Sequence, residues 1–512
     1  MKILHHLLLI SLLVIHGRSS TNLMSCSQTP YPDLCFHFVN QNDDDADAIS
    51  TFGDETSYVT RFRNSAIRAT LNQAMTTHAH LLSNMDSDAF DYRAKSALVD
   101  CLELYEDSIA ELNRSTIDST TMDHLTLLSA SMANHQTCEN GFRDFGISFP
   151  FEILSNFSKL VSNSLAIARA AAGGGDNNAA ASAEWVELVQ GSAAAADMVV
   201  AQDGSGDFRS ISEAVAAAEV RKGSGGGGRF VIYVKGGVYR ENVVIKKTMK
   251  NVMMIGDGIG STIVTAMKNV QDGSTTFRSP TFAVTGNGFI ARDMTFENMA
   301  GPEKLQAVAV LSSADHSVFY RCSFRGYQDT LYAHSKRQFY RECEIYGTVD
   351  FIFGDATAVF QNCNIFVRKP MRNQKNTVTA QARSDPNENT GFVIHNSAVG
   401  AAPDLKPVEG LYETYLGRPW KAYSRTVVMR SSLDGLVEPA GWLPWAGDFG
   451  LRTVYYGEFM NTGDGASTMG RVRWPGYHVM TSVAEAGRFT VDNFLAGSGW
   501  IPATGVPFAN GL

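Results

Sequence analysis

The sequence predicts two folds in one chain, an all-α four-helix bundle followed by an all-β, right-handed parallel β-helix. Three observations support this prediction. Short strand-like segments recur about every 20 residues in the second part of the chain, which is typical of a solenoid. The first part instead spaces its apolar residues with the 3.6-residue period of helices. A segment rich in Gly, Ala and Asn separates the two parts.

The chain opens with a short apolar segment. Residues 7–15 read LLLISLLVI, follow a lysine at position 2 and precede serines at positions 19 and 20. This pattern predicts a secretory signal at residues 1–20, because the run is too short to cross a bilayer. A membrane anchor is the weaker alternative, and no later run is long enough to span a membrane. Sequons at Asn113 (NRS) and Asn156 (NFS) are then predicted glycosylation sites.

The next part, residues 24–172, is predicted to be a four-helix bundle. Helical segments are expected at residues 54–85, 89–113, 124–145 and 150–172, joined by short polar connections. The second shows the helical period most clearly, with apolar residues at Ala97, Leu98, Cys101, Leu102, Tyr105, Ile109 and Leu112. Nothing in this part resembles a catalytic constellation. Its histidines are interpreted as surface or inter-helix residues, so no metal site is expected.

Residues 173–196 are predicted to be a flexible linker between an acidic and a weakly basic part of the chain. The first 196 residues hold 11 Lys and Arg against 23 Asp and Glu, a net charge of −12. The remaining residues hold 32 against 29, a net charge of +3. This asymmetry favours a polyanion-handling domain with an acidic companion, and ordinary surface charge is the alternative. No basic run of the nucleic-acid-binding kind is present.

Seven cysteines in an exported chain raise the question of disulfides. The bundle is predicted to contain two, Cys26–Cys35 and Cys101–Cys138. In the second part, Cys343 can bridge to Cys322 or to Cys363, and the spacing does not choose between them. Cys343–Cys363 is the pairing that we predict, and the odd number of cysteines leaves one thiol unpaired.

A ladder of cysteines predicts the β-helix of residues 197–512. Cys322, Cys343 and Cys363 lie 21 and 20 residues apart within the segments VFYRCSF, FYRECEI and VFQNCNI. Each segment alternates bulky and polar residues, as a strand with one buried face does. A fainter copy, FVIHNSAV, places Ser397 in the same ladder after a longer insertion. Residues 211–219 are the one clear helical pattern here, and residues 455–512 are expected to cap the solenoid.

The ladder brings two carboxylates together. The residues seven positions after Cys322 and Cys343 are Asp329 and Asp350, each within apolar sequence. Equivalent positions of adjacent coils stack at the strand spacing, so the two carboxylates should lie about 5 Å apart. Such a pair resists double ionisation and separates into a protonated acid and an ionised nucleophile. The alternative is a solvated pair at the coil turns.

Several motifs in the second part resemble those of plant pectin methylesterases, and the resemblance covers nearly the whole chain. In order these are GDG (256–258), QAVA (306–309), GYQDTLY (326–332), RQFYREC (337–343), GTVDFIFG (347–354), TAQAR (379–383), YLGRPW (415–420) and GW–W (441–445). The first part resembles the inhibitor-like pro-region of this family, in its paired cysteines, ALVDCLELYEDSI and NHQTCENGF. The resemblance implies a cell-wall enzyme whose partner is methylated homogalacturonan.

The resemblance also implies residue roles. Asp350 corresponds to the nucleophile that attacks the methyl ester of a galacturonate unit, and Asp329 to the proton donor and later base. Gln306 and Gln328 correspond to donors that stabilise the oxyanion, and losing one such donor costs about 2.7–4 kcal/mol in the transition state. Arg418 corresponds to the guanidinium that orients the nucleophile and keeps it ionised.

Substrate contacts follow from the same resemblance. Trp420 and Trp442 correspond to aromatic platforms for sugar rings, and Phe351 is expected to line the same groove. Gln306 and Arg418 are expected to contact the substrate as well. Core packing is the alternative role for Trp442. No metal or cofactor is implied, and the bundle or separate inhibitor proteins of this type are implied as partners.

The sequence departs from the family pattern at three positions. Leu305 replaces the His of KHQAVA, Leu311 replaces an Arg, and Asp355 replaces the Asn of GNA. The last change adds a negative charge near Asp350 that we expect to weaken polyanion binding or to shift the pH optimum. The basic cleavage motif of the family is also missing, because residues 170–208 contain no Lys or Arg. We therefore expect the bundle to stay attached or to be cut elsewhere in the linker.

These observations predict a secreted ester hydrolase that removes methyl groups from pectin, and two alternatives remain. One is a non-catalytic or autoinhibited β-helix that binds pectin. The other is a glycosidase or a lyase, because enzymes that hydrolyse glycosidic bonds also use paired carboxylates.

Overall fold

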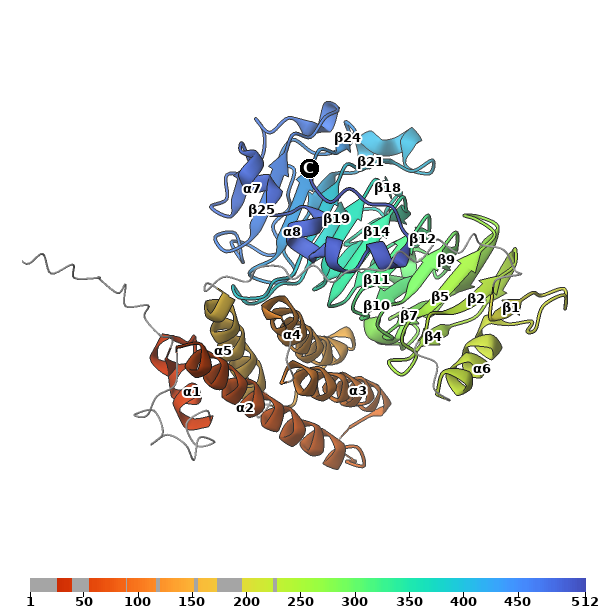
Figure 1. Ribbon diagram of the computed structural model, residues 1–512. Coiled ribbons are helices and arrows are strands. Elements are labelled where there is room, and N and C mark those ends of the chain that lie inside the picture. The colour runs from red at the N-terminus through yellow and green to blue at the C-terminus, as the bar shows by residue number, and fades with distance from the viewer. Residues whose placement is uncertain are drawn as a thin grey trace, which may run out of the picture.

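The computed structural model describes residues 25–38, 55–88, 90–116, 120–151, 155–172, 196–223 and 228–512. The predicted signal and nearly all of the predicted linker lie outside these residues. The described chain forms a helical part and a β-helix that lie against each other (Figure 1). No helix among the described residues is long and apolar enough to cross a membrane.

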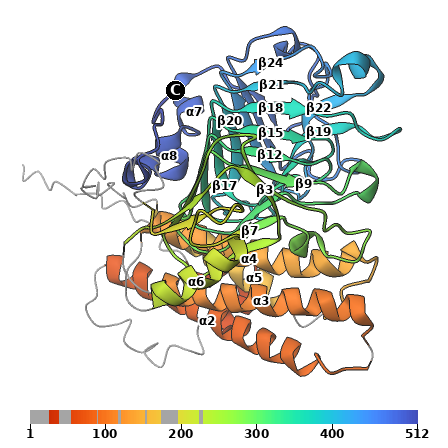
Figure 2. The same cartoon turned by 90° about the vertical axis from the view of Figure 1, so that its right-hand side faces the viewer.

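The helical part packs α2 (Glu55–Ser83), α3 (Tyr92–Ser115), α4 (Thr121–Asp144) and α5 (Ser155–Ala172) side by side (Figure 2). The short helices η1 (Cys26–Gln28) and α1 (Pro32–Phe38) lie before them. Side chains define the starts of two helices, because Asp91 accepts a hydrogen bond from the third amide of α3 and Thr120 forms a capping box with Asp123 at α4. The predicted four-helix bundle is confirmed.

Both disulfides predicted for the bundle are present. The short Cys26–Cys35 bridge closes η1 against α1, and Cys101–Cys138 joins α3 to α4. Both cysteines of the second bridge are fully buried in the bundle core, where large side chains such as Tyr105 and Phe157 pack around them. Among the predicted glycosylation sites, Asn113 is exposed and Asn156 is half-buried.

Parallel strands of the second part form three sheets that wind into a β-helix, as predicted. The first sheet contains, in spatial order, β1 (Met198–Val200), β2 (Phe230–Val234), β5 (Val252–Gly256), β8 (Ile290–Arg292), β11 (Ser317–Tyr320), β14 (Arg337–Arg341), β17 (Thr357–Gln361), β20 (Gly391–His395), β23 (Arg425–Met429), β25 (Tyr455–Phe459) and β26 (Tyr477–Val479). The second contains β3 (Gly237–Arg240), β6 (Thr262–Ala266), β9 (Thr295–Asn298), β12 (Ser323–Arg325), β15 (Glu344–Gly347), β18 (Asn364–Val367), β21 (Ala398–Ala401) and β24 (Ser432–Leu433). The third contains β4 (Val243–Ile245), β7 (Phe282–Val284), β10 (Val310–Ser312), β13 (Leu331–Ala333), β16 (Ile352–Gly354), β19 (Asn376–Gln381) and β22 (Thr414–Gly417).

The strand register reproduces the spacing of the cysteine ladder. Residues paired between β11 and β14 differ by 21 positions, as in Val318 with Phe339, and those between β14 and β17 by 20. The next pair of strands, β17 and β20, differs by 34 positions because of the longer insertion. Ser397 takes the ladder position after this insertion, where its hydroxyl accepts a hydrogen bond from the Cys363 amide at 3.0 Å.

The interior of the β-helix is filled by stacked side chains. Phe319, Tyr340 and Phe360, from β11, β14 and β17, stack with ring centroids 5.1 and 4.6 Å apart. The helix α6 (Ile211–Gly223) packs on one end of this core. The C-terminal helices α7 (Val483–Gly487) and α8 (Val491–Leu495) cover the outer face of the first sheet, so this segment packs along the solenoid as expected.

The predicted Cys343–Cys363 disulfide is wrong. Cys322, Cys343 and Cys363 are buried free thiols. Each hydrogen-bonds to a main-chain carbonyl, as the Cys343 thiol does to the Phe319 oxygen at 3.3 Å and the Cys363 thiol to the Tyr340 oxygen at 3.6 Å. Side chains at equivalent positions of parallel coils point in the same direction, whereas a disulfide needs its two Cβ atoms to converge.

The bundle covers the outer face of the third sheet. Side chains of the sheet, among them Leu311, Tyr332 and Phe353, belong to the same apolar cluster as Leu128 and Met132 of α4. In Figures 1 and 2 the helices α3 and α4 lie next to this side of the β-helix. The core of the bundle therefore continues onto the β-helix without an intervening polar layer at this place.

Candidate active site

The two predicted carboxylates occupy equivalent turns of neighbouring coils. Asp329 precedes β13 and Asp350 precedes β16, and these strands pair Leu331 with Ile352, a shift of 21 residues that also separates the two aspartates. Both aspartates have left-handed backbones, with φ of 62° and 51°. The Asp329 amide donates to the Val349 carbonyl at 3.1 Å, which ties one turn to the next. Both side chains line one cavity, so the predicted pairing is correct in register.

Two side chains hold the Asp350 carboxylate through three hydrogen bonds. Arg418, just after β22, donates from Nε to Oδ1 at 2.8 Å and from Nη2 to Oδ2 at 2.6 Å. Thr377, on β19, donates its hydroxyl to Oδ1 at 2.7 Å and accepts the Asp350 amide at 2.8 Å. A planar guanidinium that binds both oxygens favours the ionised carboxylate and defines its orientation. Arg418 in turn lies over the ring of Trp445, 4.4 Å from its centroid.

Asp329 has the opposite character. Its side chain is buried, and burial raises the pKa of its carboxyl well above the ordinary value. The negative charges of Asp350 and Asp144 raise this pKa further, and Arg418 opposes them. Asp329 is therefore the carboxyl of the pair that keeps its proton to higher pH, and it stands beside a carboxylate that Arg418 binds through both oxygens.

The cavity has a volume of about 720 Å³ and contains most of the predicted site residues. Gln306, Gln328, Arg418 and Trp420 line it together with the two aspartates. The aromatic wall consists of rings from several elements, namely Phe277, Tyr332, Phe353, Trp420, Trp445 and Phe449. Amide donors, an acid, a carboxylate and aromatic faces thus surround one space of the size that a sugar unit needs.

Two predicted substrate contacts are wrong. Phe351 is fully buried in the interior of the β-helix, and Phe353, two residues later, is the ring that faces the cavity. Trp442 is 1 % exposed, stacks on Tyr456 with centroids 4.1 Å apart and donates its indole NH to Glu458 at 3.3 Å. A bridge between Gly417 and Trp442 draws this ring inward, so Trp445 takes the place on the cavity wall that Trp442 was expected to take.

The sequence did not reveal Thr377 or Thr276. Thr377 stands opposite Asp350 because β16 and β19 are shifted by 27 residues, and a shift that includes an insertion cannot be counted from a repeat of 20 or 21. Thr276 lies on the short helix η6 (Thr276–Arg278), where it lines the cavity. A Thr at a strand start and a Thr in a loop carry no pattern that distinguishes them from structural threonines.

Two of the three departures from the family pattern have structural explanations. Leu311 lies on the outer face of β10 and packs in the apolar cluster shared with the bundle. Asp355 does not line the cavity but is buried beside it, where it accepts hydrogen bonds from Gln381 at 3.0 Å and Thr390 at 2.6 Å. Burial raises the pKa of Asp355 to about 6, so its added negative charge is reduced in acidic conditions.

The bundle closes the cavity from the other side. Five residues of α4 belong to its wall, Thr137, Asn140, Gly141, Arg143 and Asp144. The Asp144 carboxylate accepts the amide of Thr276 at 2.7 Å, and Thr137 hydrogen-bonds to Tyr332 at 3.1 Å. Helix α4 therefore covers the side of the cavity opposite the β-helix, whose wall contains the two aspartates.

Each part of the chain matches a known protein family. Residues 197–498 match the family model described as Pectinesterase, and residues 23–167 match the one described as Plant invertase/pectin methylesterase inhibitor. The chain is 51 % identical to "Probable pectinesterase/pectinesterase inhibitor 6" of Arabidopsis thaliana, over 96 % of this chain and 94 % of the relative. It is 49 % identical to "Pectinesterase 2" of Citrus sinensis, over 95 % and 94 %.

A solved structure supports the same assignment. The pectin methylesterase from carrot superimposes with a TM-score of 0.61 and 57 % identity, over 63 % of this chain and the whole of the carrot chain. Its match covers the share of the sequence that the β-helix occupies. The chain therefore belongs to the pectinesterase family and carries an N-terminal inhibitor-like region of the plant type.

Proposed function

We propose that this protein hydrolyses the methyl esters of galacturonate units in cell-wall pectin, with Asp350 as the nucleophile and Asp329 as the acid and base. Membership of the pectinesterase family supports the reaction and the substrate class. The observation that supports the residue roles is the carboxylate pair itself. Both oxygens of Asp350 accept hydrogen bonds from one arginine, and Asp329, in the adjacent coil, is buried with a raised pKa.

The first half of the reaction forms a covalent intermediate. A carboxylate oxygen of Asp350 attacks the ester carbonyl carbon, and the negative charge moves to the carbonyl oxygen. Gln306 and Gln328 line the cavity, and we assign their side-chain amides as the donors that stabilise that oxyanion. When the intermediate collapses, the bond to the methoxy oxygen breaks, Asp329 gives its proton to this oxygen, and methanol leaves.

The second half regenerates the enzyme. Asp329 is now a carboxylate and takes a proton from a water molecule, whose oxygen attacks the acyl carbon. The bond to Asp350 breaks, and the galacturonic acid unit formed loses its remaining proton to the solvent. Asp329 is then protonated again, and Arg418 again binds the Asp350 carboxylate. No redox partner enters this sequence, and the products are de-esterified pectin and methanol.

Methanol release from methylated pectin tests the proposal. The secreted full chain is assayed before and after it is cut at a protease site introduced within residues 173–195, so that a covering bundle does not mask the activity. We expect methanol from the wild type and none from Asp350→Ala or Asp350→Asn under either condition. Methanol release by Asp350→Asn at the wild-type rate would exclude the proposed nucleophile. A fall in solution viscosity without methanol would instead indicate cleavage of the sugar chain.

A second function is supported by the position of the bundle. Because residues of α4 form one wall of the cavity, we propose that the bundle blocks its own active site until it is moved or removed. Methanol release is then expected to rise at least tenfold after the linker is cut and the bundle is separated at high salt. Equal activity before and after separation would exclude this inhibition.

The location of the protein is part of the same proposal. A substrate in the cell wall and the apolar N-terminal segment both support a location outside the cell. Mass spectrometry of the secreted chain tests this directly, because its first residue reports removal of the signal and of the bundle together. We expect a start near residue 21 if the bundle stays attached.

A further inference from the structure

Helix α3 carries an acidic stripe on the side that faces the β-helix. Its members are spaced three or four residues apart, which places them on one face of a helix, and they are Asp100, Glu103, Asp107 and Glu111. The stripe extends over about 16 Å at 1.5 Å per residue. Glu106 lies at its margin.

The β-helix meets this stripe with three cations. Arg278, next to the cavity residues Thr276 and Phe277, contacts Asp100 and Glu103 at 2.5 Å each. Lys336, in the turn between β13 and β14, contacts Glu111 at 2.6 Å and Asp107 at 3.4 Å.

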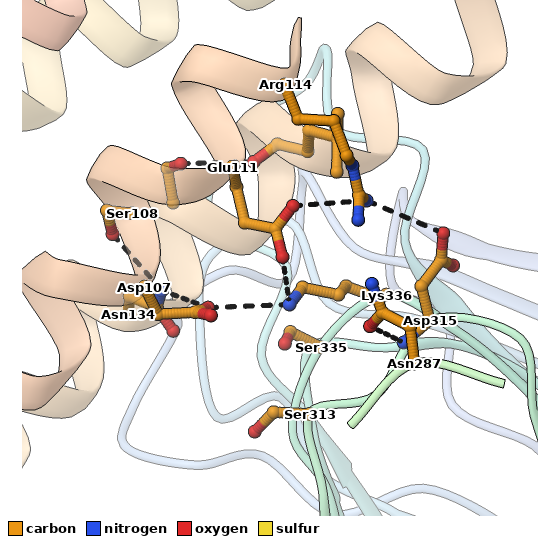
Figure 3. Close-up of polar contacts among 12 residues, drawn as sticks. Asp107, Ser108, Glu111, Arg114, Asn134, Asn287, Ser313, Asp315, Ser335 and Lys336 are labelled. Carbon is orange, nitrogen blue, oxygen red and sulfur yellow. Dashed lines mark hydrogen bonds and ion pairs between the residues drawn. The ribbon is translucent and has the colours of Figure 1, made fainter. Parts of the chain in front are cut away.

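Lys247, which follows β4, lies 3.9 Å from Glu106. Figure 3 shows the Lys336 end of the contact, where the ammonium points between the two α3 carboxylates. The cations therefore lie along the course of α3, starting at the rim of the cavity.

These three cations have no carboxylate partner within their own part of the protein. Among the described residues, every ion pair of Arg278, Lys247 and Lys336 is made to α3. Other cations of the β-helix differ in this respect, because Arg337 is paired with Asp315 and Lys246 with Glu219. The side chain of Lys336 is only 1 % exposed, and the bundle carboxylates are what compensates its charge. Removal of the bundle would leave a row of unpaired cations beside the active site.

We propose that Arg278, Lys247 and Lys336 form a basic track that binds the carboxylates of a de-esterified galacturonan stretch, and that α3 occupies this track with its own carboxylates. The proposal rests on the proposed function, since the reaction itself converts neutral methyl esters into carboxylates. A fully esterified chain offers no charge to the track, whereas a de-esterified chain offers one carboxylate per sugar unit. The stripe and the product then compete for the same cations.

The competing explanation is that the cations only dock the bundle. The two explanations differ in whether the stripe and track variants change ligand binding in the same or in opposite directions. Neutralising the stripe and neutralising the track both remove ion pairs between the bundle and the β-helix. If the cations only dock the bundle, both changes affect any ligand of the covered face in the same direction. If the cations bind the product, neutralising the stripe strengthens binding and neutralising the track weakens it.

The test measures binding of a de-esterified galacturonate oligomer to the full chain by calorimetry. We expect Asp107→Asn/Glu111→Gln to bind this oligomer about tenfold more tightly than the wild type, and Arg278→Gln/Lys247→Gln about tenfold more weakly. Lys246→Gln is the matched control, because this neighbouring lysine already has Glu219 as its partner, and it should bind like the wild type. The fully methyl-esterified oligomer offers no charge to the track, so it should not show opposite effects of the stripe and track variants when it is measured in an Asp350→Asn background that prevents its hydrolysis.

A second readout follows the displacement directly. The de-esterified oligomer should increase hydrogen exchange of the amides of α3, and the esterified oligomer should leave this exchange unchanged. The proposal would be overturned if the stripe and track variants changed the affinity for the de-esterified oligomer in the same direction, or if neither changed it. Should the double track variant fail to fold, Arg278→Gln alone serves, since this side chain is 39 % exposed and lies on a short surface helix.

The binding measurement is independent of turnover. If the chain binds the oligomer as expected but releases no methanol, the proposed function is contradicted and the proposal of a basic track still holds. A chain that releases methanol but shows no opposite effects of stripe and track contradicts the track alone.

Discussion

At the scale of single residues, the fork between Arg418 and Asp350 is the contact on which the proposed chemistry depends most. Lysine keeps the charge but cannot bind both oxygens in one plane. We expect Arg418→Lys to lower kcat/KM for methanol release by about 10- to 100-fold, because one hydrogen bond to a charged group contributes about 1.5–3 kcal/mol.

The matched control for this change is Arg321→Lys. Arg321 forms the same bidentate fork with Asp293, at 2.7 and 2.8 Å, but neither residue lines the cavity. Its replacement should leave kcat/KM within twofold of the wild type. Equal losses in both variants would show that the effect of Arg418 is structural.

A pH dependence follows from Asp329. Its pKa is raised by burial first, then by the charges of Asp350 and Asp144. The protonated form that donates to the leaving methoxide is present below this raised pKa and disappears above it. The rate of methanol release is therefore expected to fall as the pH rises through the raised pKa, in a pH–rate profile of the cut enzyme. A rate that increases steadily through alkaline pH would contradict the role of Asp329 as the acid.

At the scale of elements, the coil ladder is held by buried side chains rather than by covalent links. Cys322, Cys343 and Cys363 are free, and burial raises the pKa of Cys322 to about 12, so that its reactive thiolate is scarce. We expect an alkylating reagent to leave the native protein unmodified at the three ladder cysteines and to add three groups after unfolding without reductant. Mass spectrometry distinguishes this from a ladder disulfide, which would leave one reactive thiol.

Packing of the ladder gives a second prediction at this scale. Ile345, on β15, is fully buried between the equivalent residues Phe324 and Ile365 of the neighbouring coils. Ile345→Ala is expected to lower the free energy of unfolding by about 2–5 kcal/mol, because the neighbouring coils cannot close the cavity. Val244→Ala, at a side chain that is 50 % exposed, is the control and should cost far less. Chemical denaturation followed by fluorescence measures both.

At the scale of the whole molecule, the contact between bundle and β-helix should respond to pH. Burial raises the pKa of Asp100 to about 6 in spite of Arg278, and burial raises that of Asp144 to about 6 as well. Both carboxyls become exposed when the bundle leaves, and their pKa then returns towards 3.8. Their contribution to docking is thus fully present at low pH and is lost as the pH rises through about 6.

Between pH 7 and pH 5, each of these groups should increase the docking constant about tenfold. Asp107 and Asp123 act in the opposite direction, but their pKa values are lowered, so they matter only at more acidic pH. His334, which hydrogen-bonds to Thr137 of α4 at 2.9 Å, also opposes docking at low pH, because burial lowers its pKa to about 3. A variant of Asp100 and Asp144 therefore isolates the part of the pH dependence that these two carboxyls contribute. Size-exclusion chromatography of the linker-cut protein at several pH values measures the docked fraction. Asp100→Asn/Asp144→Asn should reduce the pH dependence, and an unchanged dependence would contradict this assignment.

Much of the fold and of the site was predictable from local patterns. The 3.6-residue period located α3 to within three residues at either end, and the cysteine spacing of 21 and 20 matched the strand register. The same count placed Asp329 and Asp350 in adjacent turns, because a repeat length is a property of the chain itself. Family motifs then identified Arg418 and the two glutamines, which no spacing connects to the aspartates.

The sequence by itself determined which residues belong to each coil and which charges each part carries, since repeat length and composition do not depend on the rest of the molecule. Only the tertiary structure decided which way side chains point out of a coil, so Phe353 and Trp445 rather than Phe351 and Trp442 reach the cavity, and the ladder thiols stay apart. It alone also set α4 over the cavity, because contacts between distant segments such as Asp144 and Thr276 arise from packing of whole faces and leave no local pattern.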